Sequence, residues 1–367
     1  MSTVWRGVAL LLLAAVVGGG ALASACGEDD DGSAPTGAAN ATAEPDPDPE
    51  ATPAGDDLSG DLVIYSGRRE PLFEPVVEAF EEATGIDVSV RYGGTGELGN
   101  ALIEERGNPR ADIFVGTDAA SAESLRAEGV FGPFDDPVLD AIDAAYRADD
   151  GSWVGISGRA RVIIYNTDLV EEADLPRSIF DITDAKWDGM IAIPTTTNSS
   201  FTAGVSAMRA LRGDDAAREL LQGLKDNGVT VLQDHTAVRQ AVGRGEFALG
   251  LVNHYYYQLE KDAGSPVGVF YTDQEEGGIG VLVNVAAASI VAGAPHEENA
   301  QAFMRFLLEE EAQEIFAALN FEYPLIPGID DRADVKRGTF LESAVNLAEL
   351  GQMNDSTIDL LDEVGLE

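Results

Sequence analysis

Short apolar runs rich in β-branched residues alternate with helical patterns along most of the chain. The run from Leu62 to Tyr65 is followed by Leu72, Val76 and Phe80 at the spacing of one helix face. Another apolar run begins at Val88, and the alternation continues from there. Because strands that alternate with amphipathic helices build layered sheets, this pattern predicts an α/β fold with a largely parallel sheet.

A second series of the same kind begins after Trp153 and predicts a second lobe. The apolar run from Gly280 to Val291 is expected to return the chain to the first lobe. Two α/β lobes that the chain links more than once make a two-lobed clamshell with a hinge and an interlobe cleft. We expect residues 60–157 and 290–330 to form lobe 1, residues 158–289 to form lobe 2, and residues 331–367 to form a C-terminal helical segment.

Residues 1–26 have the layout of a cleaved secretory signal. Arg6 precedes an apolar run from Val8 to Val17, which is shorter than the roughly 20 residues needed to cross a bilayer, and small residues lead to Cys26. Cys26 is the only cysteine, so an intramolecular disulfide is excluded, and its position resembles a slightly degenerate lipobox. We predict lipid attachment at Cys26 and anchoring to the outer face of the cell membrane, or a periplasmic location. An ordinary signal peptide cut near Ala25 is the alternative.

Residues 27–59 are predicted to form a disordered acidic linker. From Gly27 to Asp57 the chain has ten carboxylates, no Lys or Arg, and repeated Pro, a composition that favours an extended spacer. The net charge of the whole chain is −42, which disfavours nucleic acid and acidic membrane surfaces as partners.

Two predicted junctions between a strand and a helix carry groups that suit an anion. At Ser66-Gly67-Arg68-Arg69, a capping hydroxyl and two guanidinium groups lie beside the backbone N–H groups of a helix start. At Thr195 to Ser200, six small polar residues exceed the number that one helix cap needs. A plain capped helix with solvated arginines and a merely polar loop are the respective alternatives.

A third junction, Asn253-His254-Tyr255-Tyr256-Tyr257, carries phenol groups that suit a hard metal ion. In the first turn of a helix, adjacent tyrosines are about 100° apart, and two of them can reach one ligand. A hard trivalent cation prefers anionic oxygen ligands, and its charge removes the phenol proton on binding. An aromatic packing cluster is the other interpretation, and the spacing alone favours it slightly.

Catalytic motifs are weak or missing in this sequence. Gly94 to Gly99 fits GxGxxG but follows the second predicted strand, and an exported protein meets little nicotinamide cofactor. His235, His254 and His296 are far apart, and the sequence has no HExxH, zinc spacing, GxSxG or phosphate-loop motif. We therefore expect a binding protein and not an enzyme.

Several segments in order and at matching spacing resemble the ferric-ion-binding solute receptors of bacterial ABC importers, a branch of the type II periplasmic binding protein fold. They are Ile64 to Arg68, Ala79 to Ile86, Ala111 to Phe114, Ser157 to Val162 with Tyr165-Asn166, Asn253 to Tyr256, and Glu322 to Leu325. The resemblance implies that Tyr255 and Tyr256 are paired phenolate ligands of Fe3+ and that Tyr165 is a third. It also implies a synergistic carbonate or bicarbonate held by Arg68, with contacts from Asn198, Ser199, Ser200 and Asn253.

The chain departs from this family at three positions. Arg69 stands where some members have a histidine ligand, Thr117 where they have a glutamate ligand, and His235 where they have an asparagine that contacts the anion. With these departures, the resemblance is consistent with an iron site of three tyrosines, in which carbonate or water takes the remaining coordination positions. It implies a monomer that delivers Fe3+ to a membrane permease. A protein of the same fold that binds an oxyanion or a small organic solute is the alternative.

Overall fold

The computed structural model describes residues 58–366. The predicted signal segment, Cys26 and nearly all of the predicted linker lie outside the described residues. None of the helices within residues 58–366 is long and apolar enough to cross a membrane.

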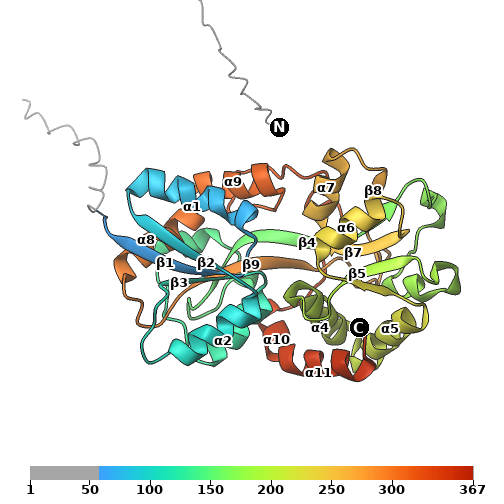
Figure 1. Ribbon diagram of the computed structural model, residues 1–367, viewed down its shortest axis with the longest axis horizontal. Coiled ribbons are helices and arrows are strands. Elements are labelled where there is room, and N and C mark those ends of the chain that lie inside the picture. Colours follow the sequence, from blue (N-terminus) through green and yellow to red (C-terminus); the bar gives the residue numbers. More distant parts are fainter. Residues whose placement is uncertain (1–57, 367) are drawn as a thin grey trace, which may run out of the picture. The chain divides into compact units, whose positions relative to one another are not determined.

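One half of the body is built on a five-stranded part of the sheet (Figure 1). Its strands are β1 (Asp61–Ser66), β2 (Asp87–Tyr92), β3 (Ile113–Gly116), β9 (Val283–Ile290) and the first part of β4 (Val154–Asn166). Its helices are α1 (Glu70–Thr84), α2 (Thr95–Glu105), α3 (Ala119–Ala127), α8 (Glu297–Leu307) and α9 (Glu310–Asn320). Phe80 and Phe303 meet edge to face in its core, with ring centroids 4.9 Å apart.

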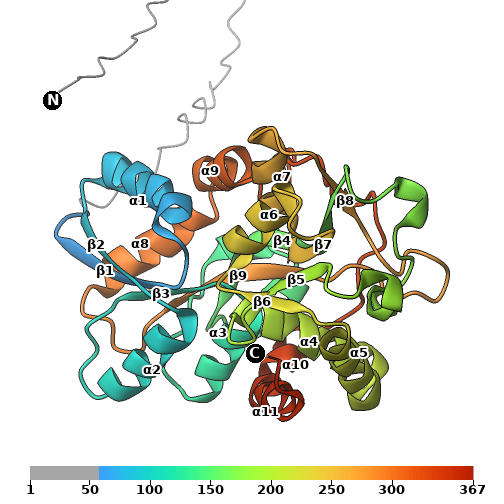
Figure 2. The ribbon, with the colours of Figure 1, turned by 45° about the vertical axis from the view of Figure 1, so that its right-hand side comes forward.

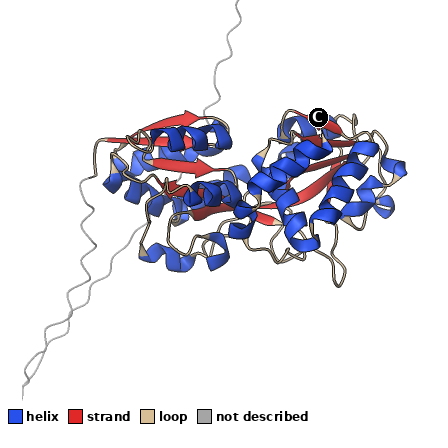
Figure 3. Cartoon of the chain, turned by 90° about the horizontal axis from the view of Figure 1, so that it is seen from below, coloured by secondary structure: helices blue, strands red, loops and turns tan. Residues whose placement is uncertain are grey.

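The other half is built on the second part of β4 and four further strands. Figure 3 shows the two halves side by side, each with strands in red and helices in blue. The strands are β5 (Ile191–Pro194), β6 (Thr230–Leu232), β7 (Leu249–Asn253) and β8 (Val267–Phe270). The helices are α4 (Ser199–Arg212), α5 (Asp214–Asp226), α6 (His235–Gly243) and α7 (His254–Asp262). Short 3-10 helices precede β4 and β5; they are η1 (Pro137–Ala141), η2 (Ala144–Tyr146), η3 (Glu172–Asp174), η4 (Ile179–Thr183) and η5 (Ala185–Trp187).

The strands β4 and β9 join the two halves. Residues 154–160 of β4 pair with β9, and residues 161–165 pair with β7, both antiparallel. The expectation of a largely parallel sheet is therefore wrong, because the two strands that cross between the halves run against their neighbours. The pairs β1 with β2 and β3, and β5 with β6 and β7, are parallel. The sheet is mixed, and the two-lobed α/β architecture is confirmed.

Local sequence explains where α1 starts and stops. Pro71 stands in its first turn, where a missing N–H costs nothing, and Glu70 complements the positive end of the helix. Phe73, Val76, Val77 and Phe80 form its buried face. Gly85 then ends it in the left-handed region at φ 75°, which glycine adopts without strain.

The last two helices, α10 (Leu347–Gln352) and α11 (Asn354–Val364), pack on both halves (Figure 2). In the first half, α10 lies on α3, where the Ser124 hydroxyl donates to the Gly351 carbonyl at 3.1 Å. In the second half, α11 lies on α4 and α5, and the hydroxyls of Ser206 and Thr357 are 2.8 Å apart. The C-terminal helices thus connect the halves along a route separate from the two crossing strands.

Candidate metal centre

A cavity of about 210 Å³ lies between the two halves. The first half contributes Gly67, Arg68, Arg69, Leu72 and Thr117, and the second contributes Asn198, Ser200, Asp234, His235, Asn253, Tyr255 and Tyr256. Arg159 of β4 and Glu322, which follows α9, complete the lining. The structure therefore brings all three predicted junctions to one place.

The paired tyrosines leave the junction between β7 and α7. Because β7 ends at Asn253 and α7 begins at His254, Tyr255 and Tyr256 lie in the first helical turn, as predicted. Their rings are 4.3 Å apart between centroids, and both side chains are buried. Burial raises the pKa of Tyr256 well above its usual value near 10; Tyr255 raises it further and Arg69 lowers it. Any cation that takes this oxygen as a phenolate must displace its proton.

The two histidines beside the tyrosines, His235 and His254, make structural contacts within the protein. His254 accepts at Nδ1 from the Ala160 N–H at 3.1 Å, so its Nε2 carries the proton and donates to the Phe321 carbonyl at 2.7 Å. Its ring stacks on Tyr323, and burial lowers the pKa of His254 to about 4. Burial and Arg161 lower the pKa of His235, whose Nε2 lies 3.3 Å from that guanidinium. Within residues 58–366, no three His, Cys, Asp or Glu side chains come together in a metal-binding arrangement.

A buried ion cluster lines the same cavity as the tyrosines. Arg68 Nη2 is 2.6 Å from Glu322 Oε2, and Arg159 Nη2 is 3.2 Å from Glu322 Oε1. The Ser157 hydroxyl lies 3.1 Å from both Arg68 Nη1 and Glu322 Oε2. Burial opposes ionisation of Glu322, but the two guanidinium groups outweigh it and lower the pKa of its carboxyl group. Two cations against one anion leave a surplus positive charge facing the cavity, which suits an anionic ligand.

The predicted anion-contacting residues fall in and beside the cavity. Asn198, Ser200 and Asn253 line it together with Arg68, and the Ser200 hydroxyl is 3.3 Å from Asn253 Nδ2. The Asn198 side chain accepts from the Phe201 N–H and so caps α4. Ser199 lies beside the lining, where its hydroxyl is 2.7 Å from that of Thr117 in the other half.

The structure does not bring Tyr165 to the cavity. In the pairing of β4 with β7, Arg161 lies opposite Asn253, whereas Tyr165 lies opposite Leu249. Four residues of strand span about 13 Å, which takes Tyr165 away from the pair. Its ring packs against Phe270 and over Gly268 of β8, and burial raises its pKa. The expectation that Tyr165 joins Tyr255 and Tyr256 in one cluster is therefore wrong.

Two residues of the site had no role in the sequence-based interpretation. Arg159 and Glu322 stand in segments that carry the resemblance, but their pairing with each other and with Arg68 depends on tertiary structure. The only local signal was the presence of charged residues, Arg159 within the apolar β4 and Glu322 before Tyr323-Pro324. Arg159 also donates to the Thr117 carbonyl at 2.6 Å, and so connects β4 with the end of β3.

A two-lobed α/β body with a polar, positively charged cavity between its halves defines a solute-binding protein. The chain belongs to the bacterial extracellular solute-binding protein family, whose model matches residues 76–342.

Named relatives make the similarity more specific. The chain is 29% identical over 311 residues to the Fe(3+)-binding periplasmic protein of Serratia marcescens, covering 83% of this chain and 90% of the relative. It is 30% identical over 316 residues to iron uptake protein A1 of Synechocystis, covering 83% and 87%. Its fold is similar to that of iron-bound HitA from Pseudomonas aeruginosa, with a TM-score of 0.78, 29% identity, and coverage of 83% and 99%.

Proposed function

We propose that this protein binds ferric iron between its two halves and delivers it to the permease of an ABC importer. The pair Tyr255 and Tyr256 is the observation that carries the proposal, because two phenol oxygens at the start of one helix supply two hard anionic ligands. The solute-binding family and the iron-binding relatives support this choice of cargo. The protein has no catalytic role in this scheme.

The remaining coordination positions of iron are taken by a small anion and by water. Arg68 supplies the positive charge for carbonate or bicarbonate, and Asn198, Ser200 and Asn253 supply hydrogen bonds. The Ser199 hydroxyl lies at the edge of this anion site. Tyr165 is left outside the ligand set because it packs on β8.

The protein works outside the cytoplasm as a monomer in this proposal. A lipid at Cys26 and the acidic linker hold the body close to the membrane and to the permease. Closure of the two halves around the loaded cavity is the state that the permease recognises. Arg69 of the first half and Asp234 of the second are in contact at 3.3 Å, and we expect the closed state to keep this ion pair.

The experiment that tests the proposal is optical. The purified protein, mixed with ferric citrate and bicarbonate, is expected to develop a visible charge-transfer band from tyrosinate to iron. A protein that stays colourless while it binds another solute would show that the cargo is not iron.

The surplus positive charge of the cavity favours a second candidate, the binding of an oxyanion alone. Replacing both Tyr255 and Tyr256 by Phe separates the two candidates, because it removes the phenol oxygens and keeps Arg68. Loss of all binding in this double variant supports iron as the cargo. An oxyanion cargo is supported if the double variant keeps its affinity for bicarbonate or phosphate and the wild type binds no iron.

A further inference from the structure

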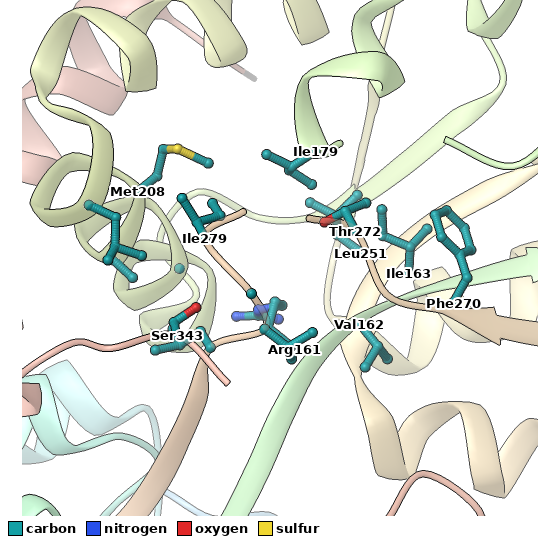
Figure 4. Close-up of a pocket in the computed structure, with 16 residues that line it drawn as sticks. Arg161, Val162, Ile163, Ile179, Met208, Leu251, Phe270, Thr272, Ile279 and Ser343 are labelled. Carbon is teal, nitrogen blue, oxygen red and sulfur yellow. The ribbon is translucent and has the colours of Figure 1, made fainter. Parts of the chain in front are cut away.

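Two small apolar cavities are lined in part by α4 and are distinct from the cavity between the halves. Each has a volume of about 90 Å³, and they share Arg161, Ile179, Gly204, Met208 and Leu251 in their linings. Neither shares a lining residue with the cavity between the halves. We refer to the cavity that also contains Phe270, Ile279 and Ser343 as the Arg161 cavity (Figure 4).

Arg161 is the only charged residue of the Arg161 cavity. Figure 4 shows its side chain rising from β4 among aliphatic side chains that include Met208, Ile279 and Leu251. Burial lowers the pKa of Arg161 to about 10, so the guanidinium is protonated at neutral pH. A cation in a mostly apolar wall is costly unless a counter-charge meets it.

The contacts of Arg161 supply no such counter-charge. Its terminal nitrogens bond to neutral groups, the Ser200 carbonyl and hydroxyl and the ring of His235, two residues that also line the cavity between the halves. No carboxylate within residues 58–366 forms an ion pair with it, although the chain has 65 acidic residues against 23 basic ones. At longer range, Tyr255, Tyr256 and Asp118 favour the charged form of Arg161, whereas the like charge of Arg159 opposes it.

We propose that the Arg161 cavity is a second ligand site, which takes a small carboxylate with an apolar tail. The carboxylate pairs with Arg161, and the hydroxyls of Thr272 and Ser343 in the same lining are additional donors. The tail lies against Met208 and Ile279. A dry apolar cavity of about 150 Å³ accommodates benzene, so about 90 Å³ limits the tail to roughly three carbons. Butanoate has this size, and the site does not depend on iron being the cargo of the cleft.

The test uses the full-length protein labelled with 13C at its methionine methyl groups. The chain has five Met residues, and a Met208→Leu variant identifies the Met208 signal. Butanoate is expected to shift the Met208 methyl in a saturable way and to leave Met304, buried in the core of the other half, unchanged. Butan-1-ol, which has the same tail without the charge, is expected to bind at least about tenfold more weakly. Absence of the Met208 shift, or equal binding of the alcohol, overturns the proposal.

Substitutions that fill the Arg161 cavity test whether butanoate binds there. Ala207→Leu places three extra carbons in the Arg161 cavity and is expected to abolish the butanoate shift, with an unchanged Met304 signal as the check on folding. Gly204→Ala is the milder variant, because its Cβ would make an ordinary contact 3.6 Å from Arg161 Nε; it is expected to weaken butanoate several-fold. A full butanoate shift in both variants would mean that the carboxylate binds elsewhere. Iron binding measured in the same samples reports on the cleft separately, so failure of one proposal is distinguishable from failure of the other.

Discussion

Arg68 Nη2 lies 2.6 Å from Glu322 Oε2, although 254 residues separate the two in the chain. The pair joins the segment before α1 to the segment after α9, and both side chains are almost fully buried. Glu322 is fixed in turn by its neighbours, because Tyr323 and Gly158 exchange two backbone hydrogen bonds. The carboxylate therefore sets the direction in which Arg68 presents its guanidinium to the cavity.

Glu322→Gln is expected to weaken both the fold and the site. Without the carboxylate, two buried guanidinium groups lose their counter-charge, a change that typically costs about 3–5 kcal/mol of unfolding free energy. Loss of a residue that orients a ligand group lowers metal affinity by about 10- to 100-fold, and we expect this loss for iron with bicarbonate. Denaturant unfolding and iron competition measure the two effects. Glu314→Gln, the same change at an exposed site on α9, is the control, and equal behaviour of the two variants would contradict the role of Glu322.

Single substitutions of tyrosine are expected to separate ligands from packing residues. Tyr255→Phe and Tyr256→Phe each remove one phenol oxygen from the cavity, so each is expected to weaken the charge-transfer band and to lower iron affinity by more than about 100-fold. Tyr165→Phe is the matched control and is expected to retain the band, because Tyr165 lies over Gly268. If Tyr165→Phe lost iron as completely as Tyr256→Phe, the ligand set proposed above would be incorrect.

Iron affinity is expected to rise with pH. Because the pKa of Tyr256 is raised well above 10, its phenol is protonated at neutral pH, and binding of iron releases the proton. For each proton released, the apparent affinity for iron rises about tenfold with each pH unit. Competition with a chelator of known proton affinity between about pH 6 and about pH 8 measures the slope. A pH-independent affinity would exclude a phenol that deprotonates on binding.

Unfolding free energy is expected to fall as the pH drops from about 6.5 to about 4. Burial lowers the pKa of His254 from 6.5 to about 4, so in this range the unfolded chain binds a proton that the folded chain does not. This contribution to stability is present above pH 6.5 and is lost toward pH 4, at most about 3 kcal/mol in total. Denaturant unfolding at several pH values measures it. His254→Gln removes the titrating group and is expected to flatten the curve, and an equally steep curve in this variant would assign the effect to other groups.

Gly351→Val is expected to loosen α10 from α3. A Cβ at this position would lie 2.5 Å from the Cβ of Glu123 and 2.8 Å from the Ala120 carbonyl oxygen, and the backbone atom cannot give way cheaply. Overpacking of this kind typically costs about 1–3 kcal/mol of unfolding free energy. Gly107→Val is the control, since a Cβ there would meet no atom within 4 Å. Equal stability of the two variants, compared by thermal unfolding, would contradict the close packing of α10.

The order of apolar and polar residues along the sequence predicted the parts of the structure that interactions between near neighbours in the chain determine. The spacing of Leu72, Val76 and Phe80 predicted α1, and residues of all three polar junctions line one cavity. The expected helix at Tyr255 and Tyr256 is also confirmed, since α7 begins one residue before them.

The features that sequence could not predict depend on register and on long-range pairing. Tyr165 was placed at the site by resemblance, but the pairing of β4 with β7 decides how far along the strand it lies. The ion cluster of Arg68, Arg159 and Glu322 joins three distant segments, and no local pattern specifies such a contact. The direction of the crossing strands β4 and β9 likewise follows from the path of the whole chain.

The helices α10 and α11 pack on both halves although they come last in the chain. Since proteins are made from the N-terminus, both sheets and every residue lining the cavity are synthesised before this contact can form. A nascent or truncated chain that stops before Leu347 would leave apolar surface of α3 and α4 uncovered, open to proteases and to aggregation. The packing of α10 and α11 thus adds a second connection between the halves, beside the strands β4 and β9.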